Sequence, residues 1–259
     1  MSNEAVLYQE QGGVVRLTIN RPADRNPLSS EVIQLLHAGL RRAQADASVR
    51  AIVLTGAGDR TFCAGGDLKP GAKSFVFDYT DPSTHYARLL NAAAECTMPL
   101  IARINGHCMA GGMGLLGMCD MAIASSNAIF GLPEVKIGLF PMQVDALLQR
   151  LIPRRKLIEL SLTGEPIDAV EAKEIGLINY HVPPAELDAK VDWLLGRLLD
   201  KSPTAIRRGK HAMEAISDMT LPQAIAYMAT QLGTLALTED ATEGLAAFNE
   251  KRAPKWPGR

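Results

Sequence analysis

Three short and nearly uninterrupted apolar runs constrain what this chain can fold into. They occupy residues 51–54, 100–104 and 121–124. Apolar runs of this length are typical of strands buried on both faces, as in a parallel sheet that is covered by helices. A fourth stretch, residues 14–19, alternates apolar and polar side chains as a half-buried strand does.

The segment between the first two predicted strands has a helical pattern. Across residues 31–43, apolar side chains recur at helical spacing, while Arg41 and Arg42 fall on the other side. Strand, helix and strand in this order predict an α/β fold with a largely parallel sheet.

The character of the sequence changes after Val182. Pro183 and Pro184 break the chain, and the amphipathic pattern that follows predicts one helix after another. We therefore divide the chain into an α/β core of residues 1–184 and a helical C-terminal region of residues 185–259. An apolar helix face needs a cover, so this second region is predicted to serve oligomerisation.

Composition excludes several classes of protein. Of the 259 residues, 47% are hydrophobic and 21% are charged, with a formal net charge of −1. These values argue against a disordered chain and against a nucleic-acid partner. No apolar run is long enough to span a membrane and no secretion signal is recognised, so we expect a cytoplasmic protein. The four cysteines form no CxxC pair, which predicts buried side chains and no metal site.

Two glycine-rich segments each follow a predicted buried strand. The first contains Ala64-Gly65-Gly66-Asp67-Leu68-Lys69, and the second contains Ala110-Gly111-Gly112-Met113-Gly114. Neither has the spacing of a nucleotide-phosphate motif. Glycine lets a backbone amide approach a ligand closely, and two such amides could hold a carbonyl oxygen that becomes an anion. Tight turns and close packing would explain the same glycines equally well.

One acidic residue stands out in a third segment. Glu134 lies among apolar residues, between Pro133 and Pro141. Burial would raise the pKa of its carboxyl group toward neutrality, where the group can take up and release a proton. The alternative is a carboxylate on a loop that is either exposed or paired with the nearby Lys136.

In their order and spacing, these segments resemble the crotonase family, the enoyl-CoA hydratase/isomerase superfamily. The resemblance covers nearly the whole chain. The segments that carry it are Leu17-Thr18-Ile19-Asn20-Arg21-Pro22 with Asn26, Cys63-Ala64-Gly65-Gly66-Asp67-Leu68, Asn105-Gly106, Ala110-Gly111-Gly112, Cys119-Asp120, Pro133-Glu134, Leu162-Thr163-Gly164, residues 172–177 and residues 243–252.

The resemblance implies a crotonase-like spiral of β-β-α units with a helical C-terminal region, assembled as a homotrimer or hexamer. It implies an acyl-CoA thioester as substrate and no separate cofactor, because CoA is part of the substrate. The catalytic groups carried over are Glu134 and the amides of Gly66 and Gly111, which would form an oxyanion hole. Phe248 and Lys251 would help to hold the adenosine end of CoA, in some family members from a neighbouring subunit.

Further contacts with the substrate are expected around the first glycine-rich segment. Lys69 and Arg25 could meet the CoA phosphates; the alternative, which the sequence slightly favours, is that both are plain surface charges. The remaining residues assigned to substrate binding are Ala64, Asp67 and Leu68.

One position departs from the family pattern. Hydratases of the family carry two catalytic glutamates, and the first of them, 20 residues before Glu134, is replaced here by Gly114. Adding water to a double bond needs one group that activates water at C3 and another that delivers a proton to C2, whereas shifting a double bond needs only one base. The sequence therefore favours Δ3,Δ2-double-bond isomerisation by an enoyl-CoA isomerase or lyase.

Two alternatives stay open. A non-catalytic acyl-CoA-binding or assembly protein would explain Gly114, but it has no physical need of Glu134, Gly66 and Gly111 together. A hydratase acting on an unusual acyl-CoA would need a substitute second acid or base. Candidates for that group are Asp145, Asp78, Asp81, His85 and Tyr86.

The acyl group itself is expected to be apolar. Phe75, Phe77 and Tyr79 lie on the variable stretch after the first glycine-rich segment and are predicted to form a wall of the acyl pocket.

Overall fold

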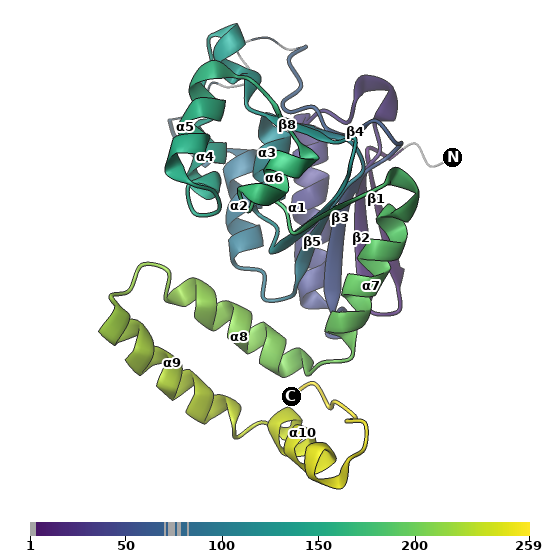
Figure 1. Ribbon diagram of the computed structural model, residues 1–259, viewed down its shortest axis with the longest axis vertical. Helices are drawn as coiled ribbons and strands as arrows, with labels where there is room; N and C mark the ends of the chain where they lie inside the picture. Colours follow the sequence, from purple (N-terminus) through teal and green to yellow (C-terminus); the bar gives the residue numbers. More distant parts are fainter. Residues whose placement is uncertain (1–3, 70, 72–75, 77–78, 82) are drawn as a thin grey trace.

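Figure 1 shows the computed structural model, which describes residues 4–69, 71, 76, 79–81 and 83–259. Phe75, Phe77 and Asp78, named above as candidates, lie outside the described residues. These residues form two sheets, the helices that cover the sheets, and a helical extension at the C-terminal end of the chain.

The larger sheet, as far as the chain is described, has six strands in the order β1-β2-β3-β5-β7-β10. The first two form an antiparallel hairpin and the other neighbours are parallel. The four strands predicted from the sequence are thus confirmed as members of one largely parallel sheet. The strands are β1 (Val6–Gln11), β2 (Val14–Ile19), β3 (Ala51–Gly56), β5 (Leu100–Ile104), β7 (Met121–Ser125) and β10 (Tyr180–Val182).

The smaller sheet is built from short strands that follow those of the larger one. In chain order, β3 leads into β4 and α2, β5 leads into β6 and α3, and β7 leads into β8 and the segment before α4. This repeated β-β-α order confirms the spiral expected from the resemblance. The short strands are β4 (Thr61–Cys63), β6 (His107–Met109), β8 (Ile129–Gly131) and β9 (Ile167–Asp168).

One face of the larger sheet packs against helices and the smaller sheet, and these share one apolar core. The longest of these helices, α1 (Ser30–Ala45), buries Val32, Leu36 and Leu40. It is capped by the preceding residue, Ser29, whose side chain accepts a hydrogen bond from the Val32 amide. The four cysteines are free and buried, as predicted. The other helices of this part are α2 (His85–Ala94), α3 (Gly111–Gly117), α4 (Met142–Leu148), α5 (Arg154–Thr163) and α6 (Ala169–Glu174).

The helix α7 (Leu187–Leu199) covers the opposite face of the sheet. Its buried side chains Leu187, Val191, Leu194 and Leu195 pack against apolar residues of β3, β5 and β7. Alternate residues of a strand point to opposite faces, which is why these strands are apolar throughout. The boundary between residues 184 and 185 remains a prediction, and the structure adds that α7 packs with the sheet.

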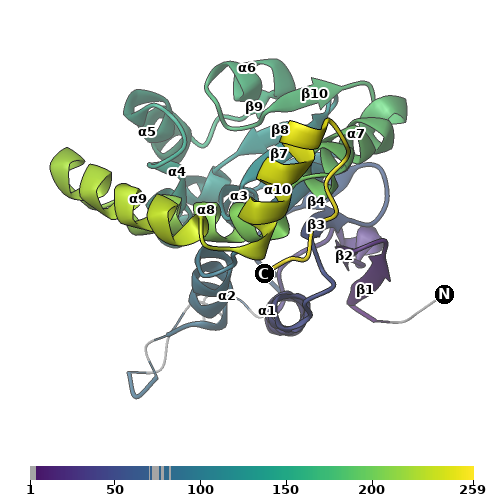
Figure 2. The ribbon, with the colours of Figure 1, turned by 90° about the horizontal axis from the view of Figure 1, so that it is seen from below.

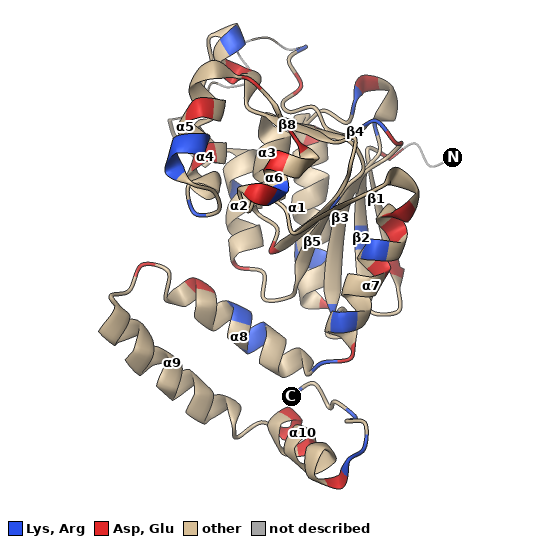
Figure 3. Cartoon of the chain, viewed as in Figure 1, with Lys and Arg blue, Asp and Glu red and all other residues tan. Residues whose placement is uncertain are grey.

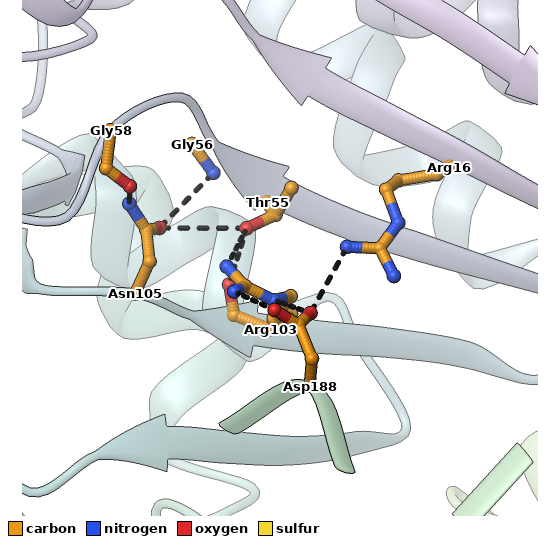
Figure 4. A network of polar contacts seen from close by, with 7 residues as sticks. All are labelled: Arg16, Thr55, Gly56, Gly58, Arg103, Asn105 and Asp188. Carbon is orange, nitrogen blue, oxygen red and sulfur yellow. Dashed lines mark hydrogen bonds and ion pairs between the residues drawn. The ribbon is translucent and has the colours of Figure 1, made fainter. Parts of the chain in front are cut away.

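A polar network fastens α7 to β5 (Figure 4). Arg103 of β5 donates two hydrogen bonds to the carboxylate of Asp188, over 2.8 and 2.9 Å. Arg103 also donates to Thr55 of β3. At the end of β5, Asn105 accepts a hydrogen bond from the Gly56 amide and donates one to the Gly58 carbonyl, so the turn after β3 is held against β5.

Three helices lie apart from the sheets: α8 (Pro203–Ala215), α9 (Leu221–Leu235) and α10 (Glu239–Glu250) (Figures 1 and 2). The Thr238 side chain caps α10 by accepting a hydrogen bond from the Ala241 amide. Asp240 is buried and ties α10 to the start of α8 by accepting hydrogen bonds from Ser202 and from the Thr204 amide.

The helix α9 projects beyond the rest of the fold (Figure 2). It carries no charged residue (Figure 3) and buries none of its side chains. None of the described helices combines the length and the hydropathy that crossing a membrane requires.

Candidate active site

The first glycine-rich segment is fixed by backbone pairing with Leu28. The Leu28 amide donates to the carbonyl of Gly65 over 2.7 Å, and the Asp67 amide donates to the carbonyl of Leu28 over 3.0 Å. This parallel bridge lies on both sides of Gly66 and does not use the amide of Gly66 itself.

The second glycine-rich segment turns sharply at Ala110. The Ala110 amide donates to the carbonyl of Gly131 over 2.9 Å, and the φ of 51° at Ala110 is unusual for a residue with a side chain. The helix α3 begins at the next residue, Gly111. An amide in the first turn of a helix has no acceptor within that helix, so the Gly111 amide is left for another acceptor.

These two turns lie against each other. A Cβ atom built on Gly111 would lie 3.8 Å from the Gly66 nitrogen. One built on Gly65 would lie 2.6 Å from the Ala110 Cβ and 3.4 Å from the Gly111 nitrogen. The close approach of the two turns therefore excludes a side chain at Gly65, and it brings the backbone nitrogens of Gly66 and Gly111 into the same neighbourhood.

Pairing of two short strands brings Glu134 to the same place. Met109 of β6 pairs with Gly131 of β8, and the chain continues from Gly131 into the 3-10 turn Pro133–Ile137. Glu134 is half-buried, and its Oε2 atom is buried without a hydrogen-bond partner in the described part of the chain. The alternative of an ion pair with Lys136 is wrong, because Lys136 pairs with Glu165 over 2.8 Å.

Burial raises the pKa of the Glu134 carboxyl group above its ordinary value. A hydrogen bond from its own backbone amide acts in the opposite direction, and repulsion from the Asp145 carboxylate raises the pKa further. A carboxyl group with a raised pKa is a stronger base once ionised, and an oxygen without a protein partner is free to accept a proton from a ligand.

Tyr86, at the start of α2, reaches the second turn. Its hydroxyl donates to the carbonyl oxygen of Gly111 over 2.6 Å. Burial raises the pKa of this hydroxyl well above its usual range, and repulsion from Cys63, Cys108 and Glu134 adds to that shift. The sequence identified Tyr86 as one candidate among five and held no signal that singled it out.

The other candidates for a second acid or base differ in their placement. On α4, the two carboxylate oxygens of Asp145 share the single proton donated by the Ser161 hydroxyl, at 3.1 and 3.0 Å, and burial raises the pKa of the Asp145 carboxyl group. Asp81 pairs with Arg88, and His85 is exposed beside Gln34. The Glu134 carboxylate contributes to the raised pKa of Tyr86, and the Asp145 carboxylate contributes to the raised pKa of Glu134.

Several residues expected to contact the substrate surround the first turn. The Ala64 amide donates to the carbonyl of Arg25 over 3.1 Å, and Asp67 accepts a hydrogen bond from Arg21 over 3.2 Å. Lys69 is exposed and donates to Asp24 over 3.0 Å. Leu68 is exposed as well, so an apolar group lies beside the turn.

Two expected contacts lie elsewhere in the chain. Phe248 belongs to α10 and Lys251 ends it, and α10 lies with α8 away from the sheets and from α3 (Figure 1). Phe248 is 81% exposed. Within one chain, these residues are not brought together with Gly66 and Gly111. Tyr79, predicted to line the acyl pocket, is exposed.

A spiral of β-β-α units with C-terminal helices, and two glycine turns that meet beside a glutamate, define a protein of the crotonase superfamily. The chain belongs to the enoyl-CoA hydratase/isomerase family, whose model matches residues 9–259. The family and the fold inferred from the sequence are thereby confirmed.

Individual members of the family align with this chain over nearly their full length. The chain is 37% identical over 265 residues to the enoyl-CoA hydratase EchA19 of Mycobacterium tuberculosis, with 100% of this chain and 98% of that protein covered. It is 34% identical over 260 residues to the (E)-benzylidenesuccinyl-CoA hydratase of Thauera aromatica, with 98% and 99% covered. The crystal structure of an enoyl-CoA hydratase from Mycobacterium smegmatis matches with a TM-score of 0.91 and 32% identity, covering 97% and 98% of the two chains.

Proposed function

We propose that this protein shifts the double bond of an enoyl-CoA between the Δ3 and Δ2 positions, with Glu134 as the only base. Two observations carry the proposal: Oε2 of Glu134 is buried without a hydrogen-bond partner among the described residues, and position 114 is a glycine, which has no acid or base to offer. One base is sufficient for this reaction, whereas water addition requires a second group.

The chemistry balances with these groups alone. The Glu134 carboxylate takes a proton from C2 of the thioester, and the electron pair of that C–H bond moves into a new C1–C2 double bond as the carbonyl π pair moves onto oxygen. The amides of Gly66 and Gly111 donate to this oxygen, which carries negative charge only after the proton has left. Collapse of the dienolate forms the C2–C3 double bond, and C4 takes the proton back from Glu134.

A hydratase is the second candidate function. The names of the relatives favour it, as does the position of Asp145, whose carboxylate influences the pKa of Glu134. In that case Asp145 would activate water while Glu134 delivers the proton to C2. Ser161 already binds both carboxylate oxygens of Asp145, which makes this group a weaker base than Glu134.

Assays with two substrates distinguish these functions. A 3-enoyl-CoA should be converted to the conjugated 2-enoyl-CoA, and its C2 hydrogen should exchange in heavy water, with little water added to crotonyl-CoA. Glu134→Gln should lower the isomerisation rate by about 10²–10⁴, and Glu165→Gln serves as the matched control for an exposed carboxylate. Rapid water addition would favour the hydratase, and binding without exchange in the parent would favour the non-catalytic protein.

We also propose that further copies of this chain cover α9, giving the expected homotrimer or hexamer. This helix exposes Leu221, Ile225 and Leu232, by 73%, 62% and 68%. Exposed apolar residues that follow one face of a helix mark a site of association. In such an assembly, Phe248 and Lys251 would reach the CoA of a neighbouring subunit. The cytoplasmic location stays a prediction.

A further inference from the structure

The space beside position 114 is occupied by Tyr86. A Cβ atom built on Gly114 would overlap the Tyr86 hydroxyl oxygen and would lie 3.2 Å from ring carbon Cζ. On the other side, Cγ2 of Val144 would lie 3.2 Å from the same Cβ. Any side chain at position 114 and the hydroxyl of Tyr86 therefore exclude each other.

The single proton of this hydroxyl has a defined partner. It is donated to the carbonyl oxygen of Gly111 over 2.6 Å, a short distance for a neutral hydrogen bond. A phenol has one proton to donate, and Tyr86 stays protonated at neutral pH because burial disfavours its charged form. Tyr86 thus serves neither as a base nor as a free acid.

Gly111, whose carbonyl oxygen accepts this hydrogen bond, lies in a turn whose conformation must be fixed by its surroundings. Gly111 has no side chain that could fix it by packing, and it follows Ala110, whose φ of 51° is strained. Such a conformation persists only when its surroundings determine it. The hydrogen bond from Ala110 to Gly131 holds one side of this turn, and Tyr86 holds the other.

We propose that Tyr86 is a positioning residue for the Gly111 amide and that Gly114 is the space that admits its hydroxyl. The catalytic half of this inference rests on the proposed function, since it takes the Gly111 amide as a donor to the thioester oxygen. The geometric half, mutual exclusion at position 114, does not depend on that function. Together they account for the absence of a side chain at Gly114.

The variant Tyr86→Phe tests the catalytic half. It removes the hydroxyl and keeps the ring, so the Gly111 amide loses its alignment. We expect kcat for isomerisation to fall about tenfold with KM within about twofold, because an oxyanion donor acts mainly in the transition state. The pH profile should be unchanged, since Glu134 remains the base. Tyr8→Phe, on β1, is the matched control, and a Tyr86→Phe enzyme with the kcat of the parent would overturn the inference.

A double-variant cycle tests the geometric half. Gly114→Ala alone should displace the hydroxyl and lower kcat at least as far as Tyr86→Phe does. In the combined variant Gly114→Ala/Tyr86→Phe the overlap with the hydroxyl is gone, and the new methyl keeps only the 3.2 Å approaches to Cζ and to Cγ2 of Val144. We therefore expect kcat to return to the value of Tyr86→Phe alone. Full activity of Gly114→Ala, or effects that simply multiply, would contradict the inference.

Failure of the proposed function would look different. If the parent exchanged no C2 hydrogen in any acyl-CoA, the proposed function would be wrong. The contact between Tyr86 and position 114 would then be tested with the same single and double variants, by measuring their midpoints of thermal unfolding. Gly114→Ala should then lower the midpoint and the added Tyr86→Phe should restore part of it. If the shifts of the unfolding midpoint were additive, the mutual exclusion of the Tyr86 hydroxyl and a side chain at position 114 would be contradicted, whatever the function of the protein.

Discussion

The amide of Ala110 donates to the carbonyl oxygen of Gly131 over 2.9 Å. This bond continues the pairing of β6 with β8 by one residue, so that the residues that follow, Gly111 on one segment and Pro133-Glu134 on the other, emerge side by side. The candidate base and one candidate oxyanion donor are therefore placed by strand register. A shift of one residue in that register would separate them.

Gly65→Ala should remove activity and stability together. The added methyl would lie 2.6 Å from the Ala110 Cβ, and the φ of 99° at Gly65 is unfavourable for any residue with a side chain. We expect the free energy of unfolding to fall by about 1–3 kcal/mol and kcat by about 10² or more, as for loss of an oxyanion donor. Denaturant titration and the isomerase assay measure the two effects.

Gly12→Ala is the matched control for this substitution. Gly12 also has a positive φ, 59°, but no atom lies within 4 Å of a Cβ built on it. It should show the conformational penalty of about 1 kcal/mol and keep its activity. A Gly65→Ala enzyme that behaved like Gly12→Ala would show that the two turns are not in close contact.

Glu134→Gln should stabilise the fold in a pH-dependent way. The pKa of Glu134 in the folded state is raised above its ordinary value of 4.5, so the folded protein holds this proton more tightly than the unfolded chain does. The stability of the parent should therefore fall as the pH rises from 4.5 through the raised pKa. Glutamine has no charge to bury, so the variant should gain roughly 0.5–2 kcal/mol at neutral pH and almost nothing below pH 4.5.

Activity should follow the opposite trend with pH. The base must be ionised, so kcat/KM of the parent should rise with pH through the pKa of Glu134. Unfolding of Glu134→Gln by urea at several pH values gives the stability curve, and Glu165→Gln controls for the loss of one carboxylate. Equal stabilisation of Glu134→Gln at acid and neutral pH would be the contradicting result.

The sequence predicted those parts of the site that depend on local pattern. The strands ending at Ile19 and Ile104, the glycine turns and the isolated Glu134 all appear as local signals, and the family resemblance supplied their order. The hydrogen bond from Tyr86 to Gly111 was beyond this approach, because it joins the starts of α2 and α3, which only the folded chain brings together. For the same reason, the helical pattern after Val182 did not reveal that α7 packs on the sheet.

Asp188→Asn should loosen α7 to a small extent. Hydrogen bonds from Arg103 lower the pKa of Asp188, and burial opposes this shift. The contribution of the pair to stability is therefore present above the ordinary pKa of 3.8 and is lost as the pH falls through the lower folded-state pKa. Because Asp188 is 63% exposed, we expect a loss of about 0.5–1 kcal/mol at neutral pH.

Asp192→Asn on the same helix is the control, since Asp192 is also exposed. The two variants should differ at neutral pH and converge in acid, when measured by urea unfolding at low salt. A difference that persisted below the folded-state pKa would mean that charge on Asp188 is not the cause.

Charges on the apolar face of α9 should dissociate the assembly. The double variant Ile225→Glu/Leu232→Glu places two carboxylates among residues that are expected to be covered by another copy, and burying them unpaired would cost several kcal/mol. Light scattering after gel filtration should show a trimer or hexamer for the parent and a smaller species for the variant. Thr230→Glu, on the opposite side of α9, should leave the assembly intact, and a monomeric parent would refute the proposal.

Installing a second acid at position 114 should turn the protein toward water addition. Gly114→Glu alone should be poorly active, because its side chain would overlap the Tyr86 hydroxyl. In the combined variant Tyr86→Ala/Gly114→Glu the ring is gone, and a carboxyl group can face Glu134 across the substrate. We expect water addition to crotonyl-CoA to rise by about 10²–10⁴ over the parent, the usual contribution of one acid or base. Tyr86→Ala alone is the control for opening the pocket. If water addition rose equally in this control, the effect would come from the removal of the Tyr86 ring, and the carboxyl group at position 114 would have supplied no proton.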